Sequence, residues 1–189
     1  YDGFGHTKLS PFPTGMDLHT PRFLLSPSRI ITQLENIREH RLPPEQLPLR
    51  VLCDLGISVS SEERRRAVAT LSNCGHVDFL KKRLSQVDIW RRYAESAFVL
   101  SAAGNGLDCH RTWELLYLGN IVITKTSSLD RLYDGLPVVT VRDWNEVSDK
   151  KNLAKWLQQY GGLTGRENVW NRLDPGRMMT TIRESLPES

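Results

Sequence analysis

The stretch from residue 97 to 130 constrains the fold of this chain more than any other part of its sequence. Its residues read AFVLSAAGNGLDCHRTWELLYLGNIVITKTSSLD. The pattern predicts four elements in order: a buried strand at 98–100, a glycine loop at 104–106, a helix from Asp108 to about Leu118, and a buried strand at 121–123. Gly119 and Asn120 follow the helix, and both residue types are typical of helix ends. Two apolar strands joined by a crossover helix indicate a βαβ unit with parallel strands.

The predicted helix keeps ionisable side chains on an otherwise apolar surface. At about 100° per residue, His110, Arg111 and Glu114 share one narrow stripe. The helix begins beside the glycine loop, with Asp108 as the expected N-cap. Ligands of open α/β sheets usually bind at such a point, where strand carboxyl ends and helix amino ends meet. Free N–H groups and the helix dipole favour an anion there, above all a phosphate.

Arg111 and Glu114 admit two interpretations. As ligand-binding residues, Arg111 would contact a phosphate with two N–H groups, and Glu114 would accept hydrogen bonds from a diol such as a ribose. As structural residues, the two would form a partly buried ion pair that holds the helix to a neighbouring element. The local sequence leaves both interpretations open.

The remaining chain alternates apolar strands with helices in the same way. We expect further strands at 8–13, 49–55, 77–80 and 137–141, and helices at 28–40, 60–74, 85–96, 128–134 and 148–160. Ser28 is the expected cap of the first of these helices. The alternation predicts a Rossmann-like three-layer α/β sandwich with a mainly parallel sheet. We expect a single domain over 1–189, with a loop-rich first segment at 1–27 and a helical tail at 163–189.

Two polar stretches outside the central unit carry open alternatives. Asp17 and His19 are either ordinary turn and surface residues or an acid and an imidazole close to a site. Arg64, Arg65 and Arg66 follow the start of a helix and are expected to form a solvated face. If the preceding loop borders the site, one of these arginines would reach a phosphate instead.

Composition narrows the classes of function. The chain has 189 residues, of which 39% are hydrophobic and 25% charged, a balance typical of a globular domain. Its net charge is only +3, and no basic stripe with interleaved aromatic residues occurs, so nucleic-acid binding is not expected. No apolar run approaches the roughly 18 residues that cross a bilayer. The three cysteines form no CxxC pair and no Asp-x-Asp pair occurs, so we expect neither a metal site nor a disulfide framework.

The run SAAGNGLDCHRTWELLYLGNIVITKTSSLDRLYDGLPVVTVRDWNEV resembles the nucleotide-sugar-binding half of GT-B glycosyltransferases. Within that group it is most similar to exostosin-like enzymes. The segment PFPTGMDLHT, at 11–20, resembles the stretch that opens this half. Together the similar segments extend from about Lys8 to Val147.

The resemblance assigns roles to individual residues. Glu114 would hold the ribose of a nucleotide diphosphate sugar, while Arg111, the amides of the glycine loop and Lys125 would hold the diphosphate. The donor-binding set that it implies is Gly104, Asn105, Gly106, Asp108, Arg111, Glu114 and Lys125. For catalysis, Arg111 would stabilise the leaving group, and His110 and Asp17 are the nearby candidates for proton transfer.

The implied activity is transfer of a sugar from a nucleotide diphosphate sugar to a hydroxyl acceptor such as a glycan, with no metal or other cofactor. GT-B enzymes have two lobes, and the sequence begins at Tyr1 without a methionine, so we expect a second Rossmann-like lobe upstream and little activity from this lobe alone. The alternative is a non-catalytic module that binds a nucleotide or nucleotide sugar. The lack of an Asn-x-Ser/Thr acceptor favours the cytoplasm, whereas location in the Golgi lumen would need an anchor in the upstream segment.

Overall fold

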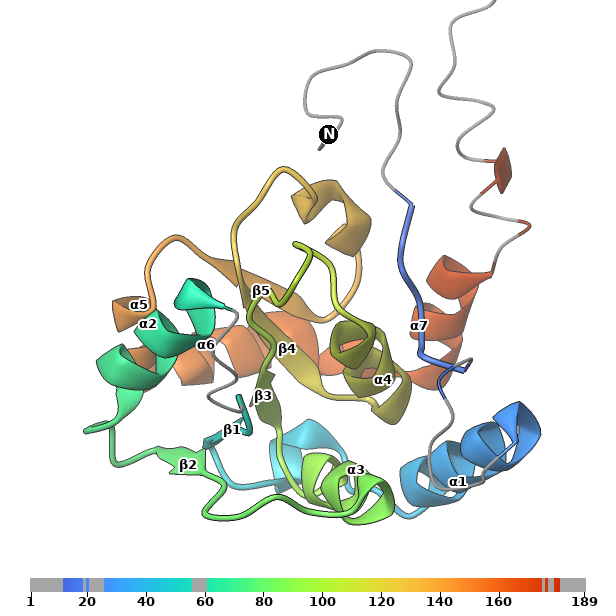
Figure 1. Ribbon diagram of the computed structural model, residues 1–189, viewed down its shortest axis with the longest axis horizontal. Coiled ribbons are helices and arrows are strands. Elements are labelled where there is room, and N and C mark those ends of the chain that lie inside the picture. The colour runs from blue at the N-terminus through green and yellow to red at the C-terminus, as the bar shows by residue number, and fades with distance from the viewer. Residues whose placement is uncertain are drawn as a thin grey trace, which may run out of the picture.

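The computed structural model describes residues 12–18, 20, 26–55, 61–174, 176 and 179–180. The strand expected at 8–13 falls mainly outside these residues, as does His19. The described residues form a three-layer α/β sandwich, with helices on both sides of a sheet (Figure 1). None of the described helices is both long and apolar enough to cross a membrane.

A five-stranded sheet with all strands parallel forms the middle layer. Its strands are β1 Val51–Cys53, β2 Val77–Phe79, β3 Phe98–Leu100, β4 Ile121–Lys125 and β5 Val138–Val141. Their order across the sheet is β2-β1-β3-β4-β5, one of the two common orders of doubly wound folds. The predicted Rossmann-like fold with a parallel sheet is therefore confirmed.

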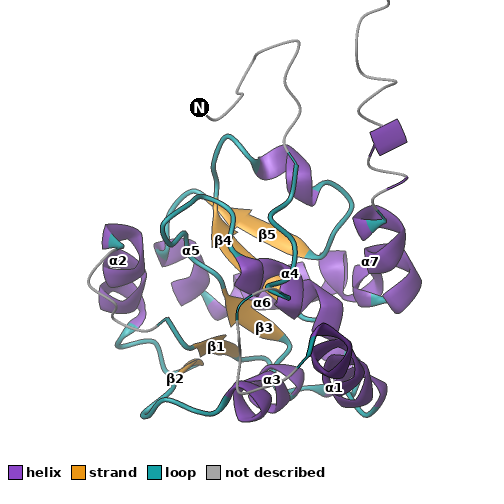
Figure 2. Ribbon diagram, turned by 45° about the vertical axis from the view of Figure 1, so that its right-hand side comes forward, coloured by secondary structure: helices purple, strands orange, loops and turns teal. Residues whose placement is uncertain are grey.

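Helices cover both faces of this sheet (Figure 2). The α-helices are α1 Pro27–Glu39, α2 Glu62–Leu71, α3 Gln86–Ala94, α4 His110–Leu118, α5 Asn145–Ser148, α6 Lys150–Tyr160 and α7 Arg166–Leu173. The 3-10 helices are η1 Pro44–Gln46, η2 Asp130–Tyr133 and η3 Gly161–Thr164. Buried side chains place α2, α5 and α6 on one face and α1, α3, α4 and α7 on the other.

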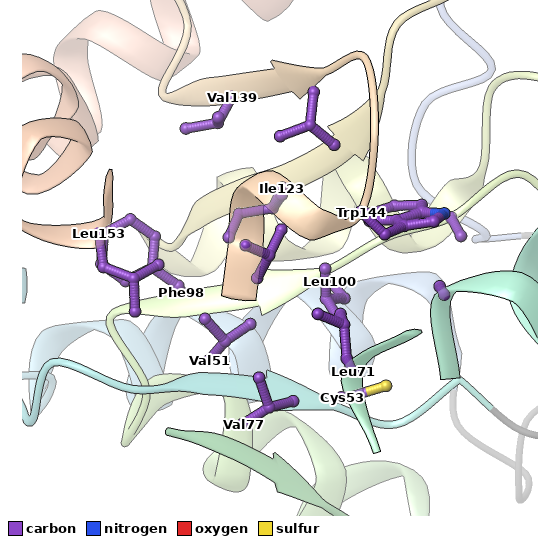
Figure 3. Close-up of a cluster of buried hydrophobic side chains, with 14 of the residues drawn as sticks. Val51, Cys53, Leu71, Val77, Phe98, Leu100, Ile123, Val139, Trp144 and Leu153 are labelled. Carbon is purple, nitrogen blue, oxygen red and sulfur yellow. The ribbon is translucent and has the colours of Figure 1, made fainter. Parts of the chain in front are cut away.

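Alternation along the strands supplies a core to each face. In β1, Val51 and Cys53 point into one core and Leu52 points into the other, as successive residues of a strand must. In Figure 3, the side chains that all five strands contribute to the core containing Val51 lie together with Leu153 of α6 and Leu71 of α2. Strands buried on both faces, such as β1 and β3, need apolar residues at every position, which explains their uninterrupted apolar runs in the sequence.

Polar caps fix where several helices begin. The capping residues are Ser26, Ser61, Ser85 and Asp149. The expectation that Ser28 caps the first helix is wrong, because Pro27 occupies the first turn and Ser26 Oγ accepts the Arg29 N–H (3.4 Å). α2 ends at Leu71 rather than near residue 74, since the chain turns there and the Cys74 N–H donates to the Leu71 carbonyl (2.9 Å).

The sheet ends on one side at β2, which carries an acidic residue at its centre. Asp78 accepts two hydrogen bonds from Arg50, from Nε to Oδ2 (2.8 Å) and from Nη2 to Oδ1 (2.5 Å). The hydrogen bond from Arg50 is the main reason that the pKa of Asp78 is lowered. Arg92 of α3 lies farther away, at 3.8 Å from Oδ2. The edge of the sheet therefore holds a two-pronged ion pair.

Candidate functional site

The strand order creates a switch point between β1 and β3. After β1 the chain leads to α2 on one face of the sheet, and after β3 it leads to α4 on the other face (Figure 1). The two loops therefore part at the carboxyl edge of neighbouring strands. Open α/β sheets bind their ligands at this position. The start of α4 lies at this edge, as the sequence analysis expected.

The glycine loop after β3 is tied to both flanking helices. Ser101 Oγ lies 2.9 Å from Thr112 Oγ1 of α4, and Ser61 Oγ donates to the Ala103 carbonyl (2.7 Å) from the start of α2. The Gly104 N–H donates to the Gly106 carbonyl (3.1 Å) and closes the loop. The loop tip at 105–107, which includes Asn105, is exposed. Hydrogen bonds therefore hold the glycine loop to α2 and α4, while its tip is exposed at the carboxyl edge of the sheet.

Arg111 pairs with Asp54, which follows β1. Its Nη2 lies 3.4 Å from Asp54 Oδ2, and the Tyr93 hydroxyl donates to the same oxygen (2.5 Å). The Asp54 side chain is 8% exposed and the Arg111 side chain 23%. Burial lowers the pKa of Arg111, but Asp54, Tyr93 and Cys109 together outweigh this effect, Asp54 contributing most, and the net shift is upward. The structural interpretation of Arg111 as an ion-paired residue therefore holds, with Asp54 in place of Glu114 as its partner.

Glu114 lies deeper, in the contact between α3 and α4. It is 5% exposed, and its Oε2 accepts a hydrogen bond from the Trp90 indole N–H (3.1 Å). Its negative charge also contributes to the raised pKa of Tyr93, after burial and Asp54. Glu114 thus belongs to the same buried polar cluster as Arg111, and its contact with a ribose stays a prediction.

Asp108 does not cap α4, which corrects the prediction from sequence. The N-cap is Cys109, whose side chain makes no capping hydrogen bond. The Asp108 carboxylate instead accepts the Trp113 indole N–H (2.9 Å to each oxygen), the Thr14 backbone N–H (2.7 Å) and the Cys109 backbone N–H (2.9 Å). Its oxygens are occupied by protein donors that position the loop and the segment at 12–18.

His110 and Asp17 are both engaged with the first described segment. His110 Nδ1 lies 2.7 Å from the Gly15 carbonyl oxygen. Asp17 is 7% exposed and accepts the Thr20 N–H at Oδ1 (2.9 Å). The segment at 12–18, blue in Figure 1, therefore lies against the start of α4 and brings residue 17 to the same part of the molecule as residue 110. Proton transfer by either side chain stays a prediction.

Lys125 ends β4, one strand away from the glycine loop. Its Nζ lies 3.4 Å from Glu63 Oε1 near the start of α2. The same Glu63 oxygen accepts the Trp144 indole N–H (2.7 Å). Lys125 is thus at the expected edge of the sheet, where its charge faces a carboxylate of the protein.

Arg64 is a further candidate site residue, which the sequence analysis did not separate from its neighbours. A Cβ built on Gly104 would lie 2.8 Å from Arg64 Nη2 and 3.6 Å from Cys109 Sγ. The guanidinium of Arg64 therefore rests on the backbone of the glycine loop. The sequence offered only a run of three arginines, and their relative orientation about α2 depends on where that helix begins.

Three buried polar atoms at this edge have no hydrogen-bond partner among the described residues. They are Arg64 Nε, Arg111 Nη1 and Asp54 Oδ1. Leaving such an atom without a partner costs about 1–3 kcal/mol. The ion pair between Arg111 and Asp54 uses other atoms of these side chains, so it does not explain why these three polar atoms are buried without a partner in the described part of the chain.

A metal-binding group or a pocket could also mark a ligand-binding site. Among the described residues, no group of three or more His, Cys, Asp or Glu side chains is arranged to hold a metal ion. A pocket of about 550 Å³ lies between α1 and α3, lined by residues that include Ile37, Arg41, Leu47 and Glu95. Leu47 and Glu95 precede β1 and β3, so this pocket is at the amino edge of the sheet, and none of the predicted site residues lines it.

Comparison with known proteins adds no assignment. No protein-family model matches the chain, and no curated protein matches it either.

Proposed function

We propose that this chain is the donor-binding lobe of an exostosin-like GT-B glycosyltransferase. It would bind a nucleotide diphosphate sugar and present it for transfer to a hydroxyl acceptor such as a glycan. The acceptor, and a catalytic base where one is used, would come from a second Rossmann-like lobe. The sequence resemblance supports this proposal, together with a fold that supplies a ligand position of the right kind.

One observation carries the proposal: three cationic side chains border the carboxyl edge around the switch point. Arg64 comes from α2, Arg111 from α4 and Lys125 from the end of β4. Each comes from a different element, and Arg64 lies against the glycine loop. A diphosphate is the part of a nucleotide sugar that such a set would recognise.

The same cations would contribute to sugar transfer. When the bond between the sugar and the nucleotide breaks, negative charge develops on the leaving diphosphate. Fixed positive groups aimed at that charge stabilise the transition state without reorganisation. This role needs no metal ion, and the sequence resemblance assigns it to Arg111.

A second candidate function is a non-catalytic module that binds a nucleotide or nucleotide sugar. The contacts of the proposed proton-transfer residues favour it: His110 lies 2.7 Å from a backbone carbonyl, and Asp17 is buried and accepts a backbone N–H. In such a module the cations would hold the diphosphate, and no transfer would follow.

Isothermal titration calorimetry on the 189-residue chain tests the binding common to both functions. The ligands are uridine, guanosine and adenosine diphosphates, each with one sugar conjugate, and the corresponding nucleosides as controls. We expect one diphosphate to bind more tightly than its nucleoside. If none of the diphosphates binds, both functions are wrong. Transfer to an acceptor by a protein that contains both lobes would then separate the enzyme from the module.

A further inference from the structure

The start of α2 is fixed to the glycine loop. Ser61 is 5% exposed, and its Oγ both donates to the Ala103 carbonyl (2.7 Å) and accepts the Arg64 backbone N–H (3.4 Å). The cap that begins the helix is therefore also the contact that joins it to the loop after β3. The contact places Arg64, whose backbone N–H Ser61 caps, in the first turn of α2 beside this loop.

The Arg64 guanidinium lies where only glycine leaves space for it. A Cβ at residue 104 would come within 2.8 Å of Nη2 and 3.5 Å of Cζ. Close approach of a side chain to backbone is a common reason for glycine in a loop. The loop and the guanidinium thus form one surface at the switch point.

Among the described residues, no carboxylate forms an ion pair with Arg64. Arg111 has Asp54 at 3.4 Å, and Lys125 has Glu63 at the same distance. Arg64 forms no ion pair with any described residue, and its buried Nε has no hydrogen-bond partner there. A partly buried guanidinium without a counter-charge is costly, and an anionic ligand would remove that cost.

We infer that Arg64 is the principal phosphate ligand of this site and that Arg111 is a positioning residue held by Asp54. The inference rests on the proposed function. It gives Arg64 the main phosphate contact, which the sequence resemblance assigns to Arg111. A planar guanidinium with paired N–H groups fits two oxygens of a diphosphate. The asymmetry follows from the ion pairs: Asp54 already offsets the charge of Arg111, whereas Arg64 offers its full charge to the ligand.

The chain offers a matched control on the same helix. Arg66 is exposed, with a side chain 63% accessible, and it forms an ion pair with Glu62 one turn earlier. Arg64→Ala and Arg66→Ala remove the same charge from positions two residues apart. A general electrostatic effect would appear in both variants, but a direct phosphate contact would appear only in the first.

The test is calorimetric titration of wild type and both variants with whichever of the uridine, guanosine and adenosine diphosphates binds wild type most tightly. We expect Arg64→Ala to weaken binding about 10-fold to 100-fold, as loss of a charge-assisted hydrogen bond predicts. Arg66→Ala should change affinity less than about fivefold, since exposed ion pairs contribute little. If Arg64→Ala does not fold, Arg64→Lys keeps the charge without the two-pronged geometry and should give a smaller but measurable loss.

The outcomes separate this inference from the function on which it rests. If wild type binds and Arg64→Ala binds equally well, Arg64 is not a ligand, and the proposed function stands. Equal losses in Arg64→Ala and Arg66→Ala would also overturn the inference, because they would show a general charge effect. If no diphosphate binds to wild type, the proposed function and the inference are both wrong.

Discussion

Arg111 of α4 and Asp54 beyond β1 face each other across the switch point of the sheet, with Nη2 3.4 Å from Oδ2. The Tyr93 hydroxyl from α3 donates to the same carboxylate oxygen. Residues that are far apart in sequence thus meet in one polar cluster under the glycine loop. The cluster joins β1 to two helices of one face, so it has consequences for stability as well as for binding.

Removal of the Tyr93 hydroxyl should destabilise the fold. Its hydrogen bond to the Asp54 carboxylate is 2.5 Å long, and hydrogen bonds to charged groups contribute about 1.5–3 kcal/mol. We expect Tyr93→Phe to lower the free energy of unfolding by that amount in urea denaturation. Tyr117→Phe is the control, because its hydroxyl lies 3.4 Å from Glu35 Oε1, near the limit for a hydrogen bond. Equal effects of the two substitutions would contradict this account.

Tyr93 should also make the fold less stable in alkali. Burial, reinforced by the charge of Asp54, raises the pKa of Tyr93 well above its ordinary value of about 10. Above about pH 10 the unfolded chain releases this proton while the folded chain keeps it, so the free energy of unfolding falls by up to about 1.4 kcal/mol per pH unit. Urea denaturation at about pH 8 and about pH 11 measures the fall.

Tyr93→Phe is the control for this alkaline effect. The variant should lose less stability between the two pH values than wild type does. Some loss should remain, because burial also raises the pKa of Tyr117, to about 12, and that of Tyr133. If wild type and variant lose the same stability, Tyr93 does not contribute.

Arg111→Ala and Glu114→Ala test the binding roles assigned by resemblance. If Arg111 and Glu114 contact the ligand directly, as the resemblance implies, each substitution should weaken nucleotide diphosphate binding by about 1.5–3 kcal/mol, the scale of a hydrogen bond that involves a charged group. Arg91→Ala is a control, because Arg91 lines the pocket at the amino edge. Thermal unfolding of each variant separates lost binding from lost stability. If a ligand that binds wild type tightly binds both variants equally well, the site is elsewhere.

Gly119 should tolerate no side chain without cost. It ends α4 with φ at +89°, in the left-handed region. Gly119→Ala should lower the free energy of unfolding by about 1–2 kcal/mol, the cost of that conformation for a residue with a Cβ. Gly162→Ala is the control: a Cβ there meets nothing within 4 Å, and its φ is not positive. A loss in the control as large as that in Gly119→Ala would refute backbone strain as the cause.

Sugar transfer should not depend on a divalent metal ion. In a protein that contains both lobes, we expect transfer to survive EDTA, because in the proposed mechanism fixed cations would stabilise the leaving diphosphate. Arg111→Ala in that protein should lower kcat about tenfold to a thousandfold, the loss found for one stabilising donor. The 189-residue chain by itself should transfer little or no sugar. Loss of transfer on chelation would refute the metal-free mechanism, and a normal kcat would remove Arg111 from catalysis.

The fold was predictable because its signals are local. Apolar runs such as 98–100 and 121–123 gave the buried strands, and Gly119 gave the end of α4. Cap positions were less predictable, since several polar residues compete for one helix start. Asp108 illustrates the limit: its carboxylate accepts the backbone N–H of Thr14, a partner that no local pattern can supply.

The sequence indicated which edge of the sheet the candidate site residues occupy, but not how they pair with one another. The sequence located the glycine loop and Arg111, but the partner of Arg111 depends on which strands are neighbours. The strand order puts β1 beside β3 and so brings Asp54 to Arg111, and this order is a tertiary property. Arg64 was hidden for a different reason. A shift of one residue in the start of α2 turns the side chain by about 100°, so any of three arginines could have faced the loop.

The ion pair at the centre of β2 limits how this molecule can associate with others. An edge strand presents unpaired backbone groups on which another sheet can extend. Here that strand spans only Val77–Phe79 and carries Asp78, whose charge Arg50 holds in place. A foreign strand added at this edge would have to lie beside that fixed charge. A companion lobe would therefore not extend the sheet at β2, and contact on that side would have to be made through loops and helix surfaces.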